Sequence, residues 1–153
     1  MMACSAPRRL ENELKAWRRG PPVENVEILE ISEDLRRWRL RLSGAEGTIY
    51  SNEVYTLLVS VSSGYPLEPP TFVFSPESVP VHPHVYSCGH ICLSLLAEDW
   101  SPALTIQSVA LSLLSMLSSA KIKERPPDDE SYSKRAAGRD PKKTVWAFHD
   151  ETC

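Results

Sequence analysis

Two cysteines and three histidines lie close together near the middle of the chain. They are His82, His84, Cys88, His90 and Cys92, in the segment HPHVYSCGHIC at 82–92. Thiol and imidazole groups bind metals, and a thiolate attacks carbonyl carbon atoms. The stretch 82–104 is too rich in Gly and Pro to form one regular helix or strand. Its side chains are therefore candidates for chemistry.

Zinc binding is one interpretation, because three residues separate Cys88 from Cys92, a spacing found in zinc knuckles. A structural zinc ion usually takes a second pair of ligands, and the only candidates are His149 and Cys153 near the end of the chain. Metal also usually substitutes for a core, whereas this chain has apolar residues enough to build one. A purely structural alternative, with histidines satisfied in turns and buried cysteines, leaves the composition of the segment unexplained.

Cys92 is the best candidate for a nucleophile. Gly89 precedes it and permits close backbone approach or positive φ, and Leu95 and Leu96 can anchor the segment to a core. We therefore expect a thiol on a short, anchored and partly exposed loop. A hydrolase would need a base and an orienting group, and no second catalytic motif appears. A thiol that only carries an acyl group, taken from another thioester and passed to an amine, needs less machinery.

Length and charge narrow the class of protein. The 153 residues fit a single domain over 1–153. A net charge of -3 argues against a nucleic-acid binder. The apolar runs are too short to span a membrane, and the first residues lack the apolar core of a secretory signal. We expect a cytoplasmic or nuclear location, where reducing conditions favour catalysis or metal binding over a disulfide framework for the four cysteines.

Hydrophobic spacing predicts an α+β fold. Strict alternation in RRWRLRLS at 36–43 is typical of a half-buried strand, and apolar residues recur at helical spacing after Thr105. With few intervening helices, the strands should form a four-stranded antiparallel meander. The predicted elements are a helix over 8–19, strands over 26–32, 36–43, 55–61 and the end of 64–74, and a long helix with its stripe at Ile106, Val109, Leu113 and Leu117.

The C-terminal part has a weaker pattern. We expect 121–153 to be partly mobile or draped over the surface, with at most a short helix near 130–137. Trp146 and Phe148 are the exception, since rings of that size usually pack in a groove.

Several spaced motifs together resemble the signature of the ubiquitin-conjugating enzymes. They are YPLEPP at 65–70, HPH at 82–84, GHICLSLL at 89–96, WSPAL at 100–104 and PPDD at 126–129. The resemblance covers nearly the whole chain. It implies an N-terminal helix, a four-stranded meander, an active-site loop, a long helix and a short irregular C-terminal region. It also implies that Cys92 holds the C-terminal glycine of ubiquitin as a thioester, supplied by an activating enzyme that uses ATP, with no cofactor on this chain.

The W-type branch of that family is the most similar. The shared features are HPH in place of HPN, extra residues before PPDD, and an ending like PKKTVWAFHDETC. The resemblance implies transfer to the α-amine of flexible substrate N-termini. The resemblance also implies that His84 stands in place of the family's Asn, which braces the loop and the developing oxyanion. It further implies that Asp129, or Asp128 as the alternative, orients the incoming amine. Cys88 stands where the branch usually has Asn, and is either inert or able to form a disulfide under oxidation.

Partner surfaces carry over in the same way. Residues 1–19 hold five basic and two acidic side chains. Arg8, Arg9 and Lys15 match the family's contact with the activating enzyme, and Leu67, Pro102 and Ala103 match its contacts with RING or U-box ligases. The simpler alternatives are a solvated helix face and a Leu67 that packs. The remaining functional alternatives are a catalytically silent ubiquitin-binding module and a carrier of another ubiquitin-like modifier.

Overall fold

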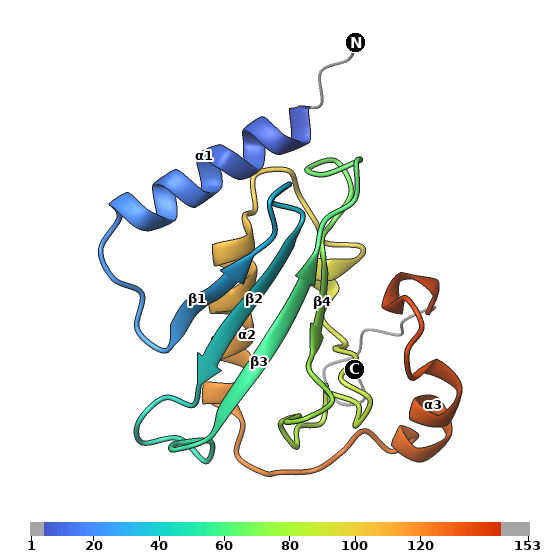
Figure 1. Cartoon of the computed structure of the whole chain (residues 1–153). Coiled ribbons are helices and arrows are strands. Elements are labelled where there is room, and N and C mark those ends of the chain that lie inside the picture. Colours follow the sequence, from blue (N-terminus) through green and yellow to red (C-terminus); the bar gives the residue numbers. More distant parts are fainter. Residues whose placement is uncertain (1–4, 145–153) are drawn as a thin grey trace.

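The computed structural model describes residues 5–144 of the chain (Figure 1). Its elements are α1 (Ser5–Arg19), β1 (Val26–Ile31), β2 (Arg37–Ser43), β3 (Val54–Ser60), β4 (Thr71–Phe74), η1 (Ser94–Leu96), α2 (Ile106–Ser119), α3 (Asp129–Ala136) and η2 (Pro141–Lys143). The four strands form one antiparallel sheet in the order β1-β2-β3-β4. The predicted α+β class and the four-stranded meander are confirmed.

Alternation along β2 decides which face of the sheet is buried. Trp38, Leu40 and Leu42 are buried, while the arginines between them are exposed. On the outer face, Arg41 pairs with Glu27 of β1 at 3.0 Å. Exposed ion pairs of this kind add little stability, so the sheet is held mainly by its apolar inner face.

Helix α2 covers the inner face of the sheet (Figure 1). Its buried stripe is Ile106, Val109, Ala110, Leu113 and Leu117. Thr105 starts the helix as a capping box with Ser108, which satisfies backbone N–H groups that would otherwise lack partners. The position where α2 begins is thus fixed by local sequence, and the loop before it is fixed with it.

Helix α1 lies at the end of the sheet where α2 begins (Figure 1). Leu10 is fully buried in the main core. The ring of Trp17 packs against that of Trp38, with 6.1 Å between the ring centroids. The exposed face of this amphipathic helix carries most of its basic side chains.

The C-terminal part of the described chain contains α3 and η2. The short helix expected near 130–137 is present as α3, while partial mobility of 121–153 remains a prediction. Trp146 and Phe148 lie outside the described residues. Across residues 5–144, none of the helices has both the length and the apolar content needed to cross a bilayer.

We expect Leu57→Ala in β3 to lower the free energy of unfolding by about 2–5 kcal/mol, because it leaves a cavity under α2. Leu57 is fully buried, whereas its neighbour Leu58 faces outward and is half-buried. Leu58→Ala is the matched control and should cost clearly less. Urea unfolding measures both, and equal losses would contradict the assignment of the two faces.

Candidate functional site

The segment 82–92 is attached to the sheet through Gly89. The amide of Phe74, at the end of β4, donates to the Gly89 carbonyl at 2.9 Å. Gly89 has a φ of +99°, and a Cβ atom there would lie 2.2 Å from the Phe74 oxygen. Both the positive φ and the close approach expected of Gly89 are therefore confirmed, and any other residue would force the segment away from β4.

Cys92 follows three residues later and is held by its backbone. Its amide donates to the His84 carbonyl at 2.8 Å, which ties the cysteine to the HPH turn. Its side chain is only 3% exposed. The expectation of a partly exposed residue is therefore wrong for this structure.

The sulfur atoms of Cys92 and Cys88 are in different states. Cys88 is a free cysteine, whereas the Cys92 sulfur is in a disulfide bond. The sequence predicts no disulfide framework for the four cysteines, and the bonded state of Cys92 is a feature that it does not anticipate. A sulfur in a disulfide is not a thiolate, so it must be reduced before it can act as a nucleophile.

His82 supports the HPH turn. Its Nδ1 accepts a hydrogen bond from the His84 amide at 2.9 Å, and the side chain is 4% exposed. Burial, with a smaller effect of His84, lowers the pKa of His82 to about 4. The imidazole is therefore neutral at physiological pH, which suits its role as an acceptor within the turn.

His90 connects the same segment to the C-terminal part of the chain. Its Nδ1 lies 2.8 Å from the hydroxyl of Tyr132 on α3, and that hydroxyl lies 2.8 Å from Oγ1 of Thr144. Burial lowers the pKa of His90 and so favours the neutral ring. The ring of Tyr132 also packs on that of Tyr86, with 3.9 Å between the ring centroids. The sequence reasoning missed both tyrosines, although Tyr86 lies inside the singled-out segment.

Asp128 and Asp129 lie against the same segment. Oδ1 of Asp128 accepts from the Tyr86 hydroxyl at 2.9 Å, and Oδ1 of Asp129 accepts from the Ser87 amide at 2.7 Å. Ser133 also donates to Asp129 at 3.1 Å. The two carboxylates therefore brace the segment from the start of α3.

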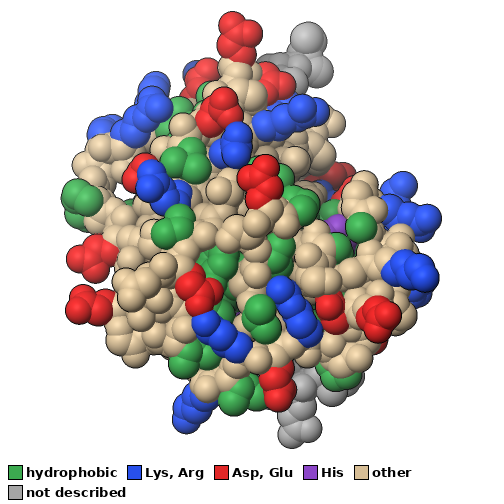
Figure 2. All heavy atoms as spheres, turned by 60° about the horizontal axis from the view of Figure 1, so that its bottom comes forward, with side chains coloured by type: hydrophobic (Ala, Val, Ile, Leu, Met, Phe, Trp, Pro, Cys, Tyr) green, Lys and Arg blue, Asp and Glu red, His purple; other side chains and the backbone are tan. Residues whose placement is uncertain are grey.

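Residues 5–144 contain no preformed metal site. Within this range, no three His, Cys, Asp or Glu side chains come together in a way that could hold an ion. His82 and His90 instead use Nδ1 for hydrogen bonds within the protein. The surface shown in Figure 2 mixes basic and acidic side chains, with small apolar areas between them. No extended basic area is seen on that face.

The residues predicted to meet ligases lie in two adjoining loops. Leu67 is 80% exposed, so it does not pack as the simpler alternative required, and Pro102 and Ala103 are exposed as well. Trp100 Nε1 donates to the Pro66 carbonyl at 2.8 Å and joins the two loops. The structure thus brings these three residues to one region of the surface.

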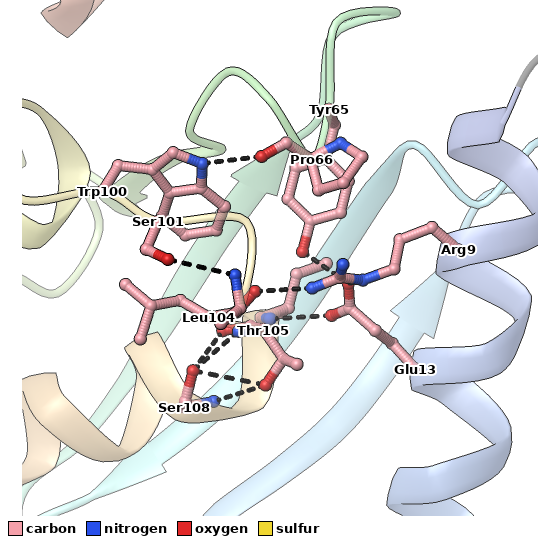
Figure 3. Close-up of polar contacts among 11 residues, drawn as sticks. Arg9, Glu13, Tyr65, Pro66, Trp100, Ser101, Leu104, Thr105 and Ser108 are labelled. Carbon is pink, nitrogen blue, oxygen red and sulfur yellow. Dashed lines mark hydrogen bonds and ion pairs between the residues drawn. The ribbon is translucent and has the colours of Figure 1, made fainter.

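The basic residues of α1 divide into two kinds. Arg8 and Lys15 are exposed, as an interaction with the activating enzyme would require. Arg9 instead turns inward, with Nε 2.8 Å from Glu13 and one terminal nitrogen 2.7 Å from the Leu104 carbonyl (Figure 3). Its guanidinium is used within the protein, a role that helical spacing alone does not reveal.

Comparison with known proteins agrees with this geometry. The family model described as ubiquitin-conjugating enzyme matches residues 9–149. A probable ubiquitin-conjugating enzyme E2 W-A of Danio rerio is 49% identical over 150 residues, which cover 97% of this chain and 99% of that protein. The ubiquitin-conjugating enzyme E2 W of Caenorhabditis elegans is 46% identical and covers 99% of both chains.

A solved structure extends the likeness to three dimensions. The crystal structure of a ubiquitin conjugating enzyme from Agrocybe aegerita superposes with a TM-score of 0.85 at 36% identity, covering 92% of this chain and all of that one. The sheet order, the loop that carries the cysteine and the sequence relatives lead to the same conclusion. The chain belongs to the W-type branch of the ubiquitin-conjugating enzymes, cysteine acyl transferases that receive ubiquitin from an activating enzyme and work with ubiquitin ligases.

Proposed function

We propose that Cys92 carries ubiquitin and passes it to the α-amine of substrate N-termini. The observation that supports this is the placement of Cys92 on a segment fixed from two sides. The sheet holds the segment at Gly89, and α3 holds it at Ser87. A nucleophile whose backbone is held in this way loses little entropy when a large acyl group is attached.

The transfer consists of two exchanges. Two molecules of a thiol reductant first open the Cys92 disulfide by exchange and are themselves joined as a disulfide. The released Cys92 thiolate then attacks the ubiquitin thioester on the activating enzyme, a new C–S bond forms, and the thiolate of that enzyme leaves. The substrate amine then attacks the same carbonyl carbon, a C–N bond forms, and the Cys92 thiolate leaves as the amine loses a proton. ATP is used by the activating enzyme, and this chain needs no cofactor.

His84 and the two aspartates are the proposed assisting groups. An imidazole N–H of His84 would donate to the oxyanion, since its backbone is one hydrogen bond from that of Cys92. Asp129, or Asp128 beside it, would accept from the incoming amine. Because both also brace residues 86–87, their loss should affect the placement of the segment as well as the orientation of the amine.

The preference for α-amines follows from proton chemistry at the site. With reference pKa values of about 10.4 for lysine and about 7.7 to 8.0 for an α-amine, the neutral fractions at pH 7 are roughly 0.04% and roughly 10%. The neighbouring His82 and His90 are buried, and each already uses Nδ1 within the protein. An amine with the larger neutral fraction has the advantage, and a flexible N-terminus can reach the loop.

Partner contacts follow the same proposal. Arg8 and Lys15 would face the activating enzyme, whereas Arg9 is occupied by Glu13 and the Leu104 carbonyl, and Leu67, Pro102 and Ala103 would face RING or U-box domains. The alternatives of a silent ubiquitin-binding module and of another modifier are less favoured. A silent module has no use for a cysteine fixed in this way, and the relatives are named for ubiquitin.

We expect Cys92→Ser to abolish the reductant-sensitive ubiquitin adduct, because a serine forms an oxyester that thiols do not cleave. Pre-reduced protein is incubated with activating enzyme, ATP and ubiquitin, and the products are separated on a non-reducing gel. Cys88→Ser is the matched control, since it removes the thiol four positions away and should leave the adduct intact. An adduct lost in Cys88→Ser but kept in Cys92→Ser would refute the assignment.

The charged protein should discharge faster to a short lysine-free peptide with a free N-terminus than to free N-acetyl-lysine. At pH 7 and equal concentrations we expect a difference of about 250-fold, set by the neutral fractions of the two amines. The same peptide with an acetylated N-terminus is the control and should give no discharge above hydrolysis. Faster discharge by the lysine side chain would overturn the α-amine preference.

The discharge rate should also depend on pH in a way that identifies the amine. Since the neutral amine attacks, the rate with the peptide should rise up to about pH 8 and then level off, while the rate with lysine should rise toward about pH 10. His82, with a pKa of about 4, stays neutral over this range, and burial keeps the pKa of His90 below its ordinary value. A peptide profile that is flat from pH 6 to 8 would argue that amine deprotonation does not limit the transfer.

A further inference from the structure

A buried carboxylate joins α1 to the two loops that hold the ligase-facing residues. Glu13 is 9% exposed and accepts three hydrogen bonds (Figure 3). Its Oε2 accepts from Arg9 Nε at 2.8 Å and from the Tyr65 hydroxyl at 2.5 Å, and its Oε1 accepts from the Ile106 amide at 2.8 Å. The donors thus come from α1, from the first loop and from the start of α2.

Charge and burial make this arrangement specific. A buried carboxylate is costly unless donors surround it, and the N-terminus of a helix favours negative charge. Ile106 is the first residue of α2, so its amide has no partner within the helix and Glu13 supplies one. Tyr65 is 1% exposed, and burial together with Glu13 raises the pKa of its hydroxyl, which remains a donor.

Further contacts connect the two loops to each other and back to α1, so that the contacts form a closed circuit. The first loop contains Leu67, and the second contains Pro102 and Ala103. Arg9 binds the Leu104 carbonyl at 2.7 Å, and Trp100 binds the Pro66 carbonyl at 2.8 Å. The rings of Tyr65 and Trp100 pack together, with 5.8 Å between their centroids. The second loop is therefore held on both sides of its exposed stretch, and the first loop is held immediately before Leu67.

Those exposed stretches are the ligase-facing residues themselves. Leu67 follows Pro66 directly, and Pro102 and Ala103 lie between Trp100 and Leu104. The side chains of these three residues take no part in the contacts made by Glu13, Arg9, Tyr65 and Trp100. The distance between the two exposed stretches nevertheless depends on those contacts. Binding of a partner across two loops requires that spacing to be set before the encounter, because ordering loops during binding costs affinity.

We propose that Glu13 is a positioning residue for ligase recognition, which fixes the Leu67 loop and the Pro102–Ala103 loop at one distance from each other. This rests on the proposed ligase contacts and adds a residue that touches no partner. Glu13 acts through Tyr65 and Ile106, and Arg9 completes the connection to the second loop.

Glu13→Gln tests the proposal with little change in shape. In either orientation of the amide its nitrogen meets a donor, either the Ile106 amide or Arg9 and Tyr65, so one side of the arrangement loses its acceptor and the ion pair is lost. The probe is an isolated RING or U-box domain chosen because it accelerates ubiquitin discharge from the unaltered protein. The domain concentration that gives half-maximal acceleration should rise about tenfold, as expected for the loss of a charged hydrogen bond.

Two further variants separate positioning from general damage. Glu11→Gln removes an exposed carboxylate from the same helix and should leave the half-maximal concentration unchanged. Tyr65→Phe removes only the hydroxyl, and we expect a shift in the same direction of about threefold. If Glu13→Gln folds poorly, Tyr65→Phe still tests whether the contact with Glu13 positions the loops.

Hydrogen exchange gives a readout that needs no partner. In Glu13→Gln, amides in 62–68 and 100–106 should exchange about tenfold faster, while those of β2 and β3 keep their rates. An unchanged half-maximal concentration, a shift matched by Glu11→Gln, or equal acceleration across the sheet would overturn the proposal. If the unaltered protein forms no ubiquitin thioester, the proposed function fails, and the loop exchange still decides whether Glu13 positions the loops.

Discussion

The approach of Gly89 to the end of β4 is the constraint on which the site depends. The Phe74 amide reaches the Gly89 carbonyl at 2.9 Å, in space that no side chain at 89 could share. Because β4 is part of the sheet that α2 covers, this contact connects the segment to the main core. Cys92 is three residues further along, so its position follows from the sheet rather than from the loop's own preferences.

The segment is held less strongly on its other side. There it meets α3, an eight-residue helix with a small cluster of Tyr86, Tyr132 and Ala136 and a set of polar contacts. Such a short helix owes its stability to the contacts it makes, and small clusters open more easily than large cores. A site that must accept the end of ubiquitin and then a substrate amine benefits from this asymmetry, since the α3 side can adjust while the sheet side keeps Cys92 in place.

The sequence predicts what depends on local periodicity, and much less of what depends on distant contacts. Alternation in β2 and the apolar stripe of α2 are readable because each element repeats its own pattern, and spaced motifs locate the cysteine. The inward turn of Arg9 and the bond from Glu13 to Ile106 join residues more than ninety positions apart, and no local pattern reports them. The disulfide state of Cys92 is hidden from the sequence for a related reason, since connectivity depends on which sulfur atoms meet in space.

The same distant contacts assign different roles to neighbouring charges on α1. An acidic partner can approach the exposed Arg8 or Lys15 at only the modest cost of ordering a surface side chain. Using Arg9 in the same way would take the guanidinium from Glu13 and from the Leu104 carbonyl, leaving a buried carboxylate with fewer donors. That loss would fall on the support of the two loops. The basic face of α1 therefore combines a surface able to meet partners with one arginine that maintains the shape of a neighbouring surface.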